Sequence, residues 1–233
     1  MQDVSGGRMV MVLVDPAATF ARIVLQPTWG VTLAFLMAVT IVSSAVTFHR
    51  MDFTTFVRQQ VLAAGQNPTT DVIQEQVDLV NQWGGVVSLI GALTLPVLVS
   101  AVAFVFWIAV SLLGHEVPYG VSFSVVLHAM MPFAFAALLT VALALSQDTI
   151  SAVEAMQGGL LISHLGFLAP DTASPALQSL LNSIDLFSLW TVFLLTIGFR
   201  AATRVATPEA AATVLLLWLA YVALKVGCMA LWQ

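Results

Sequence analysis

The feature that most constrains this chain is a run of 20 residues, 29–48, that contains no charged side chain. An α-helix rises about 1.5 Å per residue, so a run of this length matches the roughly 30 Å hydrocarbon core of a bilayer. Pro27 precedes the run, and His49 and Arg50 end it. Because the run is uncharged throughout and is bounded by polar residues, it predicts a transmembrane helix.

Four further apolar segments of comparable length follow, at 86–113, 121–145, 180–199 and 210–231. Hydrophobic residues make up 60% of the chain and charged residues only 8%, whereas about a quarter of the residues in a typical soluble domain are charged. A water-soluble fold of this size could not bury so much apolar surface. The predicted fold class is therefore all-α, a polytopic integral membrane bundle of about five transmembrane helices whose first partner is the lipid bilayer.

Two segments between the spans contain polar side chains. Residues 52–82 place three carboxylates at helical spacing, which predicts a solvated helix that caps the bundle. Residues 150–168 are fairly apolar but are interrupted by Glu154, Gln157 and His164. We expect the second segment to be an interfacial or re-entrant helix pair, and the alternative is a sixth span.

Residues 1–28 are expected to form a cytoplasmic N-terminal segment ahead of a single transmembrane domain, 29–233. Asp15 and Pro16 form a typical helix start, with a carboxylate at the N-cap and a proline in the first turn. Over residues 17–26, apolar and polar side chains fall on different faces of a helix. This pattern predicts a short amphipathic helix that lies in the membrane interface.

The arginines predict how the chain is oriented in the membrane. With the N-terminus inside, the cytoplasmic segments hold Arg8, Arg22, Arg200 and Arg204, and the outer segments hold Arg50 and Arg58. Cytoplasmic loops carry an excess of positive charge, so we expect the N-terminus in the cytoplasm and, after five spans, the C-terminus outside. The early apolar run 9–14 is too short for a signal peptide, so the first span should direct insertion itself.

The sequence contains no pattern that indicates catalysis, a cofactor or a metal ion. His115 and Glu116 are adjacent, so on a helix they would point apart, and His128 lies beyond a break at Pro118. Cys228 is the single cysteine, which leaves no multi-thiolate site. The serines lie in no nucleophile motif, and no basic cluster indicates nucleic acid. We therefore predict a protein that is not an enzyme.

Asp185 and Lys225 are ionisable residues inside the predicted spans 180–199 and 210–231. An ionisable side chain in lipid is costly, which makes it a candidate for function. The two spans are sequential and should be antiparallel, so both charges would lie about 22–24 Å from the cytoplasmic ends of their helices. We predict that they form a buried ion pair that locks the two helices together. The alternative is a proton or ion relay, which would need further polar groups in series across the membrane.

Three pieces of the sequence carry a resemblance to a known family. They are Asp15-Pro16 with Phe20, Ile23 and Pro27; residues 114–119 with His128, Ala129 and Pro132; and residues 184–190 with Ile197, Gly198 and Arg200. In these pieces the chain resembles the Yip family, the Ypt/Rab-interacting membrane proteins, and it looks like a bacterial-type member. The family-motif positions are Asp15, Pro16, Tyr119, Pro132, Asp185, Trp190 and Gly198.

The resemblance implies five spans, a cytosolic N-terminus and an outer C-terminus, and it implies little chemistry. Eukaryotic members carry a longer cytosolic N-terminal region that engages small GTPases, whereas about 28 residues precede the first span here. Some bacterial relatives are associated with ABC-type exporters. Fold-level analogy of this kind does not settle function.

Two functions from different classes remain open at this point. The first is a non-enzymatic scaffold or accessory protein that binds other integral membrane proteins, an ABC-type exporter among the candidates, or a second copy of itself. The alternative is a small transporter or channel with its own conduction path. A polar stripe along several spans would favour the transporter. We see no such stripe, so the scaffold is the leading hypothesis.

Overall fold

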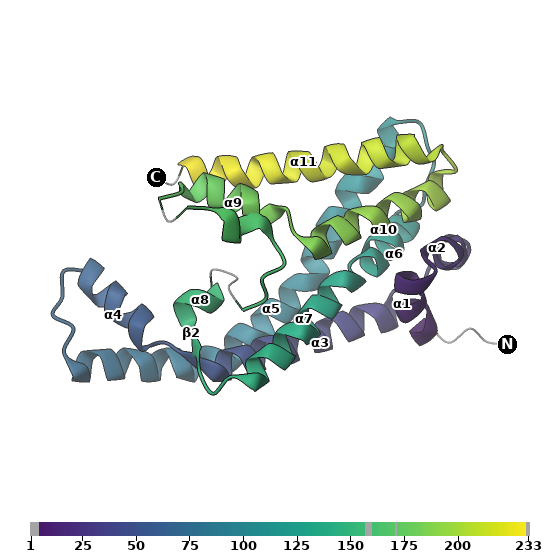
Figure 1. The fold of residues 1–233 in the computed structure, drawn as a ribbon. Coiled ribbons are helices and arrows are strands. Elements are labelled where there is room, and N and C mark those ends of the chain that lie inside the picture. Colours follow the sequence, from purple (N-terminus) through teal and green to yellow (C-terminus); the bar gives the residue numbers. More distant parts are fainter. Residues whose placement is uncertain (1–4, 157–159, 171, 232–233) are drawn as a thin grey trace. The chain divides into compact units, whose positions relative to one another are not determined.

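The structure of the chain, a computed structural model, describes residues 5–156, 160–170 and 172–231. Within these residues, five helical segments are long and apolar enough to cross a membrane, with mean hydropathies from 1.5 to 2.4. They are α3 (Gly30–Arg50), α5 (Thr70–Leu112), α6 with α7 (Tyr119–Ser146), α10 (Leu186–Thr203) and α11 (Thr207–Leu231). The predicted fold class, an all-α bundle of transmembrane helices, is confirmed (Figure 1).

Shorter elements precede and connect these spans. They are α1 (Ser5–Val14), α2 (Pro16–Leu25), α4 (Thr54–Ala63), α8 (Ala152–Met156), the 3-10 helix η1 (Leu165–Leu168) and α9 (Pro175–Ser183). Two short strands, β1 (Met51–Asp52) and β2 (Ile150–Ser151), pair in parallel with Met51 opposite Ile150. The strands do not change the fold class, because each contains only two residues.

The second span is part of a much longer helix than the sequence indicates. α5 contains 43 residues and begins at Thr70, so the predicted cap helix and the predicted span 86–113 are one element. Pro96 lies inside α5 without ending it. The hydroxyl of Ser100 donates to the Pro96 carbonyl at 2.7 Å, which is the bond to the preceding turn that serines often make in membrane helices.

The third and fourth predicted spans are each divided by a break. α6 (Tyr119–Ala129) ends with Met130 as its C-cap and α7 (Met131–Ser146) begins at the next residue, because Pro132 has no backbone N–H to continue the ladder. The predicted segment 180–199 is wrong at its start, since α9 ends at Ser183 and α10 begins only at Leu186. Asp185 is the N-cap residue of α10 rather than a member of its first turn.

Segment 150–168 contains no spanning helix among its described residues. It forms β2, the five-residue α8 and the four-residue η1, all far shorter than the roughly 20 residues a span requires. Gln157 lies outside the described residues. The sixth-span alternative is therefore wrong for the part of the segment that the structure describes.

The predicted amphipathic helix is α2, and a second helix, α1, precedes it. Asp15 is the N-cap of α2, its carboxylate accepts from the Ala18 amide at 3.2 Å, and proline follows in the first turn. Phe20 and Ile23 are fully buried on one side of α2. The carboxylate satisfies an amide that the first turn leaves without a partner, and proline loses no bond there.

The chain divides into two compact units, and the boundary falls within α3, α5 and α7. Unit 1 comprises Met1–Leu36, Pro96–Ala134 and Ser163–Gln233. In it α2, α6 and α10 pack against one another, and α11 packs on both α9 and α10 (Figure 1). Val125 and Leu194 are fully buried in this core, and the rings of Phe106 and Phe199 stack with centroids 4.7 Å apart.

Unit 2 comprises Met37–Leu95 and Phe135–Ile162. Its hydrophobic cluster contains Phe53, Val57, Val61, Ile73 and Ala152, with Phe48 packed against it. The hydroxyl and the amide of Thr54 both donate to Asp52, which lowers the pKa of that carboxyl below its ordinary value even though slight burial opposes the shift. These bonds place an anion at the N-terminus of α4, where the helix dipole favours it.

Candidate functional site

The sequence-predicted site residue Asp185 lies at the junction of α9 and α10 in unit 1. Its two carboxylate oxygens have different partners: one accepts from the Ser188 amide at 2.8 Å, and the other accepts from the Ser163 hydroxyl. The first bond is the N-cap of α10, where both an orphan amide and the helix dipole favour a carboxylate. The second bond joins α10 to the segment before η1.

Backbone hydrogen bonds strengthen this connection. His164 and Asp185 form an isolated antiparallel bridge. The Leu165 amide donates to the Ile184 carbonyl at 3.1 Å, and the Leu186 amide donates to the Ser163 carbonyl at 3.0 Å. The segment before η1 is therefore held against the start of α10 by backbone bonds as well as by the carboxylate.

Lys225 lies on α11 and contacts α9 rather than Asp185. Its ammonium donates to the Ser183 hydroxyl at 3.1 Å, and that hydroxyl donates to the Ser179 carbonyl at 2.8 Å. The structure therefore does not bring Asp185 and Lys225 together as the predicted direct ion pair. The break between α9 and α10 explains the difference, because it turns the carboxylate into a helix cap with donors of its own.

A polar layer surrounds this junction. The Gly166 amide donates to His164 Nδ1 at 3.0 Å, and the Gln178 amide group donates to the Gly166 carbonyl and to Asn182 Oδ1, each at 3.3 Å. A β-carbon at Gly166 would lie 1.8 Å from Asn182 Oδ1, so a larger residue there would displace the Asn182 side chain. Within the described residues, two buried atoms of this layer have no hydrogen-bond partner, His164 Nε2 and Ser179 Oγ.

These contacts do not assemble a catalytic group. Ser163 donates to Asp185 directly, whereas in a hydrolytic triad the serine donates to the histidine. His164 Nδ1 already accepts from a backbone amide, which places the proton of the neutral ring on Nε2. In the part of the chain that the structure describes, no group of three or more His, Cys, Asp or Glu residues could hold a metal ion.

His128 is the other embedded polar residue that the sequence singles out. It lies on α6 and is fully buried. Its Nδ1 atom is 2.8 Å from the Ser124 carbonyl, and its Nε2 atom is 2.9 Å from the Thr32 hydroxyl. A carbonyl only accepts, so Nδ1 carries a proton and Nε2 of the neutral ring accepts from Thr32. The histidine thus connects α6 to the start of α3 by a hydrogen bond. His115 and Glu116 lie in the loop between α5 and α6.

Several family-motif positions have structural roles in unit 1. The Tyr119 hydroxyl donates to the Ser100 carbonyl at 3.1 Å and so joins α6 to α5. Gly198 on α10 allows close packing, because a β-carbon there would lie 2.5 Å from Val125 Cγ1 and 3.1 Å from the Phe20 ring. Asp15 and Pro16 start α2, and Pro132 follows the break between α6 and α7. Trp190 is half-buried on α10, and nothing in the structure explains its identity.

A family model described as the Yip1 domain matches residues 10–228. The chain belongs to the Yip1 domain family. The match begins within α1 and ends within α11, so it contains the candidate site residues described in this subsection. No curated protein and no solved structure matches the chain.

Sequence reasoning identified Asp185 and Lys225 but missed the serines that contact them. Ser163 and Ser183 stand in no recognisable motif, and serine is common in membrane helices. One signal for the break was present: Ser174 followed by Pro175 is the same kind of helix start as Asp15 followed by Pro16. It marks α9 as a separate helix, which leaves Asp185 available to cap the next one.

Proposed function

We propose that this Yip1 domain protein is a non-enzymatic scaffold or accessory protein that binds other integral membrane proteins, with an ABC-type exporter as one candidate partner. The proposal rests on how the hydroxyl groups of the spans are used. Among the described residues, eight of them donate to carbonyls of their own helices at 2.7–3.0 Å: those of Ser88, Thr94, Ser100, Thr140, Ser146, Thr196, Thr203 and Thr213.

A hydroxyl that donates to its own helix has used its one proton, so it can offer a passing solute only the lone pairs of its oxygen. Transporters place polar groups and broken helices around a site near the middle of the membrane, whereas the carboxylate at the break before α10 bonds to the Ser188 amide and to Ser163. Both ring nitrogens of the buried His128 also have partners within the chain, the Thr32 hydroxyl and the Ser124 carbonyl. These contacts favour helices that are closed to solutes and whose outer faces meet lipid or other proteins.

The surface available to a partner includes α11. Only 11% of the most apolar part of this helix is buried within the chain. Its exposed side chains include Leu216, Tyr221 and Leu224, with exposed fractions of 67%, 60% and 69%. Without a hydrophobic driving force between helices in lipid, such a face binds a partner through packing and lipid entropy.

The proposed orientation places the N-terminus in the cytoplasm and the C-terminus outside. Arg200 and Arg204 support it, because Arg200 lies in the last turn of α10 and Arg204 begins the short connection to α11. Positive charge in a short loop favours the cytoplasmic side. The proposed domain organisation, a cytoplasmic segment 1–28 followed by a transmembrane domain, follows from the same orientation.

Photo-crosslinking in the native host tests the partner. A photo-reactive amino acid at Leu216 or Leu224 should give a discrete protein adduct that mass spectrometry identifies as an integral membrane protein. The matched control is the same amino acid at Val214 or Val222, which lie on the same helix but are 0% and 5% exposed. Adducts with lipid alone from both exposed positions would contradict the proposal.

Reconstitution tests the alternative function. The purified chain in liposomes should produce no flux of ions or small solutes above the level of empty liposomes. Robust flux that a single substitution in a span abolishes would establish a conduction path and overturn the scaffold proposal.

A further inference from the structure

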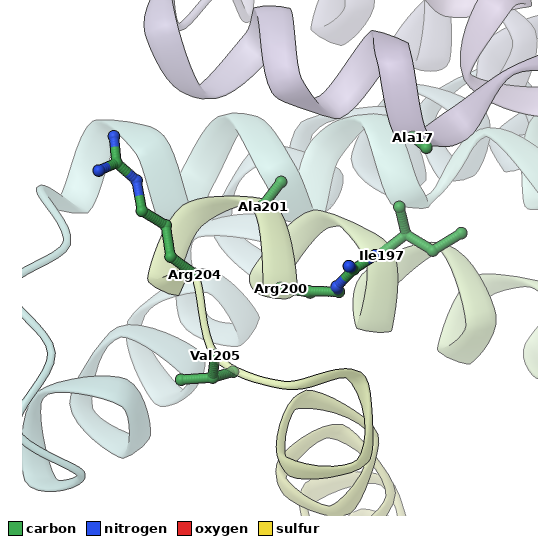
Figure 2. Close-up of a pocket in the computed structure, with 6 residues that line it drawn as sticks. All are labelled: Ala17, Ile197, Arg200, Ala201, Arg204 and Val205. Atoms are coloured by element: carbon green, nitrogen blue, oxygen red, sulfur yellow. The ribbon is translucent and has the colours of Figure 1, made fainter.

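A hollow of about 340 Å³ lies where α2 meets the C-terminal end of α10 in unit 1. Its lining residues are Ala17, Ile197, Arg200, Ala201, Arg204 and Val205. Figure 2 shows Ala17 on α2 across from Ile197 and Ala201 on α10, with Arg204 extending from the end of α10. The small side chains of Ala17 and Ala201 leave room between the two helices, and the two arginines provide positive charge beside that room.

Neither guanidinium is engaged within the described chain. Arg200 and Arg204 are both exposed, and neither side chain has a hydrogen bond or an ion pair with another described residue. Two acids are near in sequence to the hollow. Asp15 caps α2 through the Ala18 amide, and Glu209 lies in the first turn of α11. The arginines therefore remain available for an anion from outside the chain.

The backbone of Arg204 supports a role for its side chain. Arg204 follows α10 as its C-cap with φ 60° and ψ 19°, in the left-handed region, and its amide donates to the Arg200 carbonyl. Glycine is the residue that helix ends favour in this conformation, because a β-carbon is strained there. Arg204 holds this conformation at the end of α10, where its side chain lines the hollow.

The hollow lies at the depth of the lipid headgroups. α10 and α11 both have the length and hydropathy of spans, they pack side by side, and only residues 204–206 separate them. A connection this short between two antiparallel spans must lie at a membrane surface. α2 packs on α10 through its buried side, and Ala17 on its exposed side borders the hollow. This placement holds whichever side of the membrane the connection faces.

We propose that the hollow binds the phosphate-bearing headgroup of an anionic phospholipid between α2 and the end of α10. Arginine suits this ligand, because its planar guanidinium donates paired hydrogen bonds to phosphate oxygens and is more weakly hydrated than an ammonium. The apolar side chains of Ile197 and Val205 would lie along the glycerol end of the lipid. Binding there would fix α2 against α10 in the membrane interface.

Native mass spectrometry of the full chain in detergent tests this site, with phosphatidylglycerol and phosphatidylcholine of the same acyl chains as probes. The wild-type chain should bind one phosphatidylglycerol about tenfold or more tightly than phosphatidylcholine. The substitutions Arg200→Gln and Arg204→Gln should each weaken phosphatidylglycerol binding about tenfold, since a hydrogen bond to a charged group contributes at least that factor. Arg58→Gln, which removes an exposed arginine of α4 in unit 2, is the matched control and should leave the binding unchanged.

A second variant separates lipid binding from folding. Arg204→Gly should raise or preserve the thermal stability of the lipid-free chain, because glycine relieves the strained backbone. The same variant should lose the stabilisation that phosphatidylglycerol gives to the wild type. Equal binding of both lipids by the wild type, or unchanged phosphatidylglycerol binding in Arg200→Gln and Arg204→Gln, would overturn the proposal. Equal stabilisation by inorganic phosphate alone would overturn the assignment to a lipid.

Discussion

The ammonium of Lys225 donates to the hydroxyl of Ser183 at 3.1 Å, and Ser183 lies only two residues before Asp185. Asp185 accepts in turn from Ser163 and from the Ser188 amide. Each charge therefore has neutral donors or acceptors as its partners. Such partners satisfy a half-buried charge without the strict geometry that a desolvated ion pair requires.

This arrangement predicts that the two charges contribute to stability almost independently. Asp185→Ala should lower the free energy of unfolding by about 0.5–2 kcal/mol through loss of the α10 cap, and Lys225→Met should lower it by about 1 kcal/mol or less. The double variant should show a coupling energy below about 0.5 kcal/mol, because the partners do not overlap. Unfolding in mixed detergent micelles measures all three values.

The control for these variants is Glu209→Gln, which neutralises an exposed carboxylate at the start of α11. It should change the free energy of unfolding by less than about 0.5 kcal/mol. A direct ion pair would instead make each single substitution cost about 3–5 kcal/mol and the double substitution much less. That pattern would restore the pairing expected from the sequence.

Gly198 should not tolerate even one added methyl group. In Gly198→Ala the new β-carbon would meet Val125 at 2.5 Å and the Phe20 ring at 3.1 Å, so α2 and α6 would have to move away from α10. Overpacking of this kind costs about 1–3 kcal/mol, which thermal unfolding in detergent will detect. Gly120→Ala is the matched control, because a β-carbon at Gly120 would meet nothing within 4 Å. A Gly198→Ala protein as stable as Gly120→Ala would show that these helices pack less closely.

The helices that could be predicted from the sequence are those that a single local feature determines. A charge-free run of span length can be placed only in a bilayer, and Asp15-Pro16 starts a helix whatever surrounds it. The break before α10 was harder to predict, because Ser183 and Asp185 lie in a stretch that is otherwise apolar enough to continue as a helix. The break forms because Asp185 caps α10 and also accepts from Ser163, which comes from elsewhere in the chain. Without these two bonds the stretch could continue as one helix.

The candidate site depends on contacts that no sequence spacing encodes. Ser163 lies 22 residues from Asp185, and Ser183 lies 42 residues from Lys225. The chain offers many serines and threonines to either charge, and tertiary packing selects among them. The hollow beside Arg200 could not be predicted from the sequence either, because α2 and α10 are far apart along the chain. Their packing around Gly198 is what brings Ala17 close to Ala201.

The orientation can be tested with single cysteines in a Cys228→Ser background. Ala206→Cys lies in the exposed connection between α10 and α11, and Asn67→Cys lies in the exposed segment before α5. With the N-terminus in the cytoplasm, an impermeant maleimide added to intact cells should label the cysteine at 67 and should not label that at 206. Both should react after the membrane is permeabilised. Labelling at 206 alone in intact cells would invert the topology.

The hydrogen bond between Thr32 and His128 should contribute to stability, whereas a comparable buried hydroxyl should not. Thr32→Val removes the group that contacts His128 Nε2 at 2.9 Å, and it leaves that buried nitrogen without its partner. Hydrogen bonds between membrane helices are worth roughly 0.5–2 kcal/mol, so we expect a loss of that size.

Thr191→Val is the matched control, because it makes the same chemical change at a residue of similar burial. The Thr191 hydroxyl has no hydrogen-bond partner among the described residues, and Thr32 and Thr191 are 2% and 8% exposed. A hydroxyl that is buried without a partner is unfavourable, so replacing it with a methyl group should leave the stability unchanged or raise it. Thermal unfolding of both variants in one detergent provides the comparison. Equal losses in the two variants would mean that the cost comes from the shape of valine and not from the bond to His128.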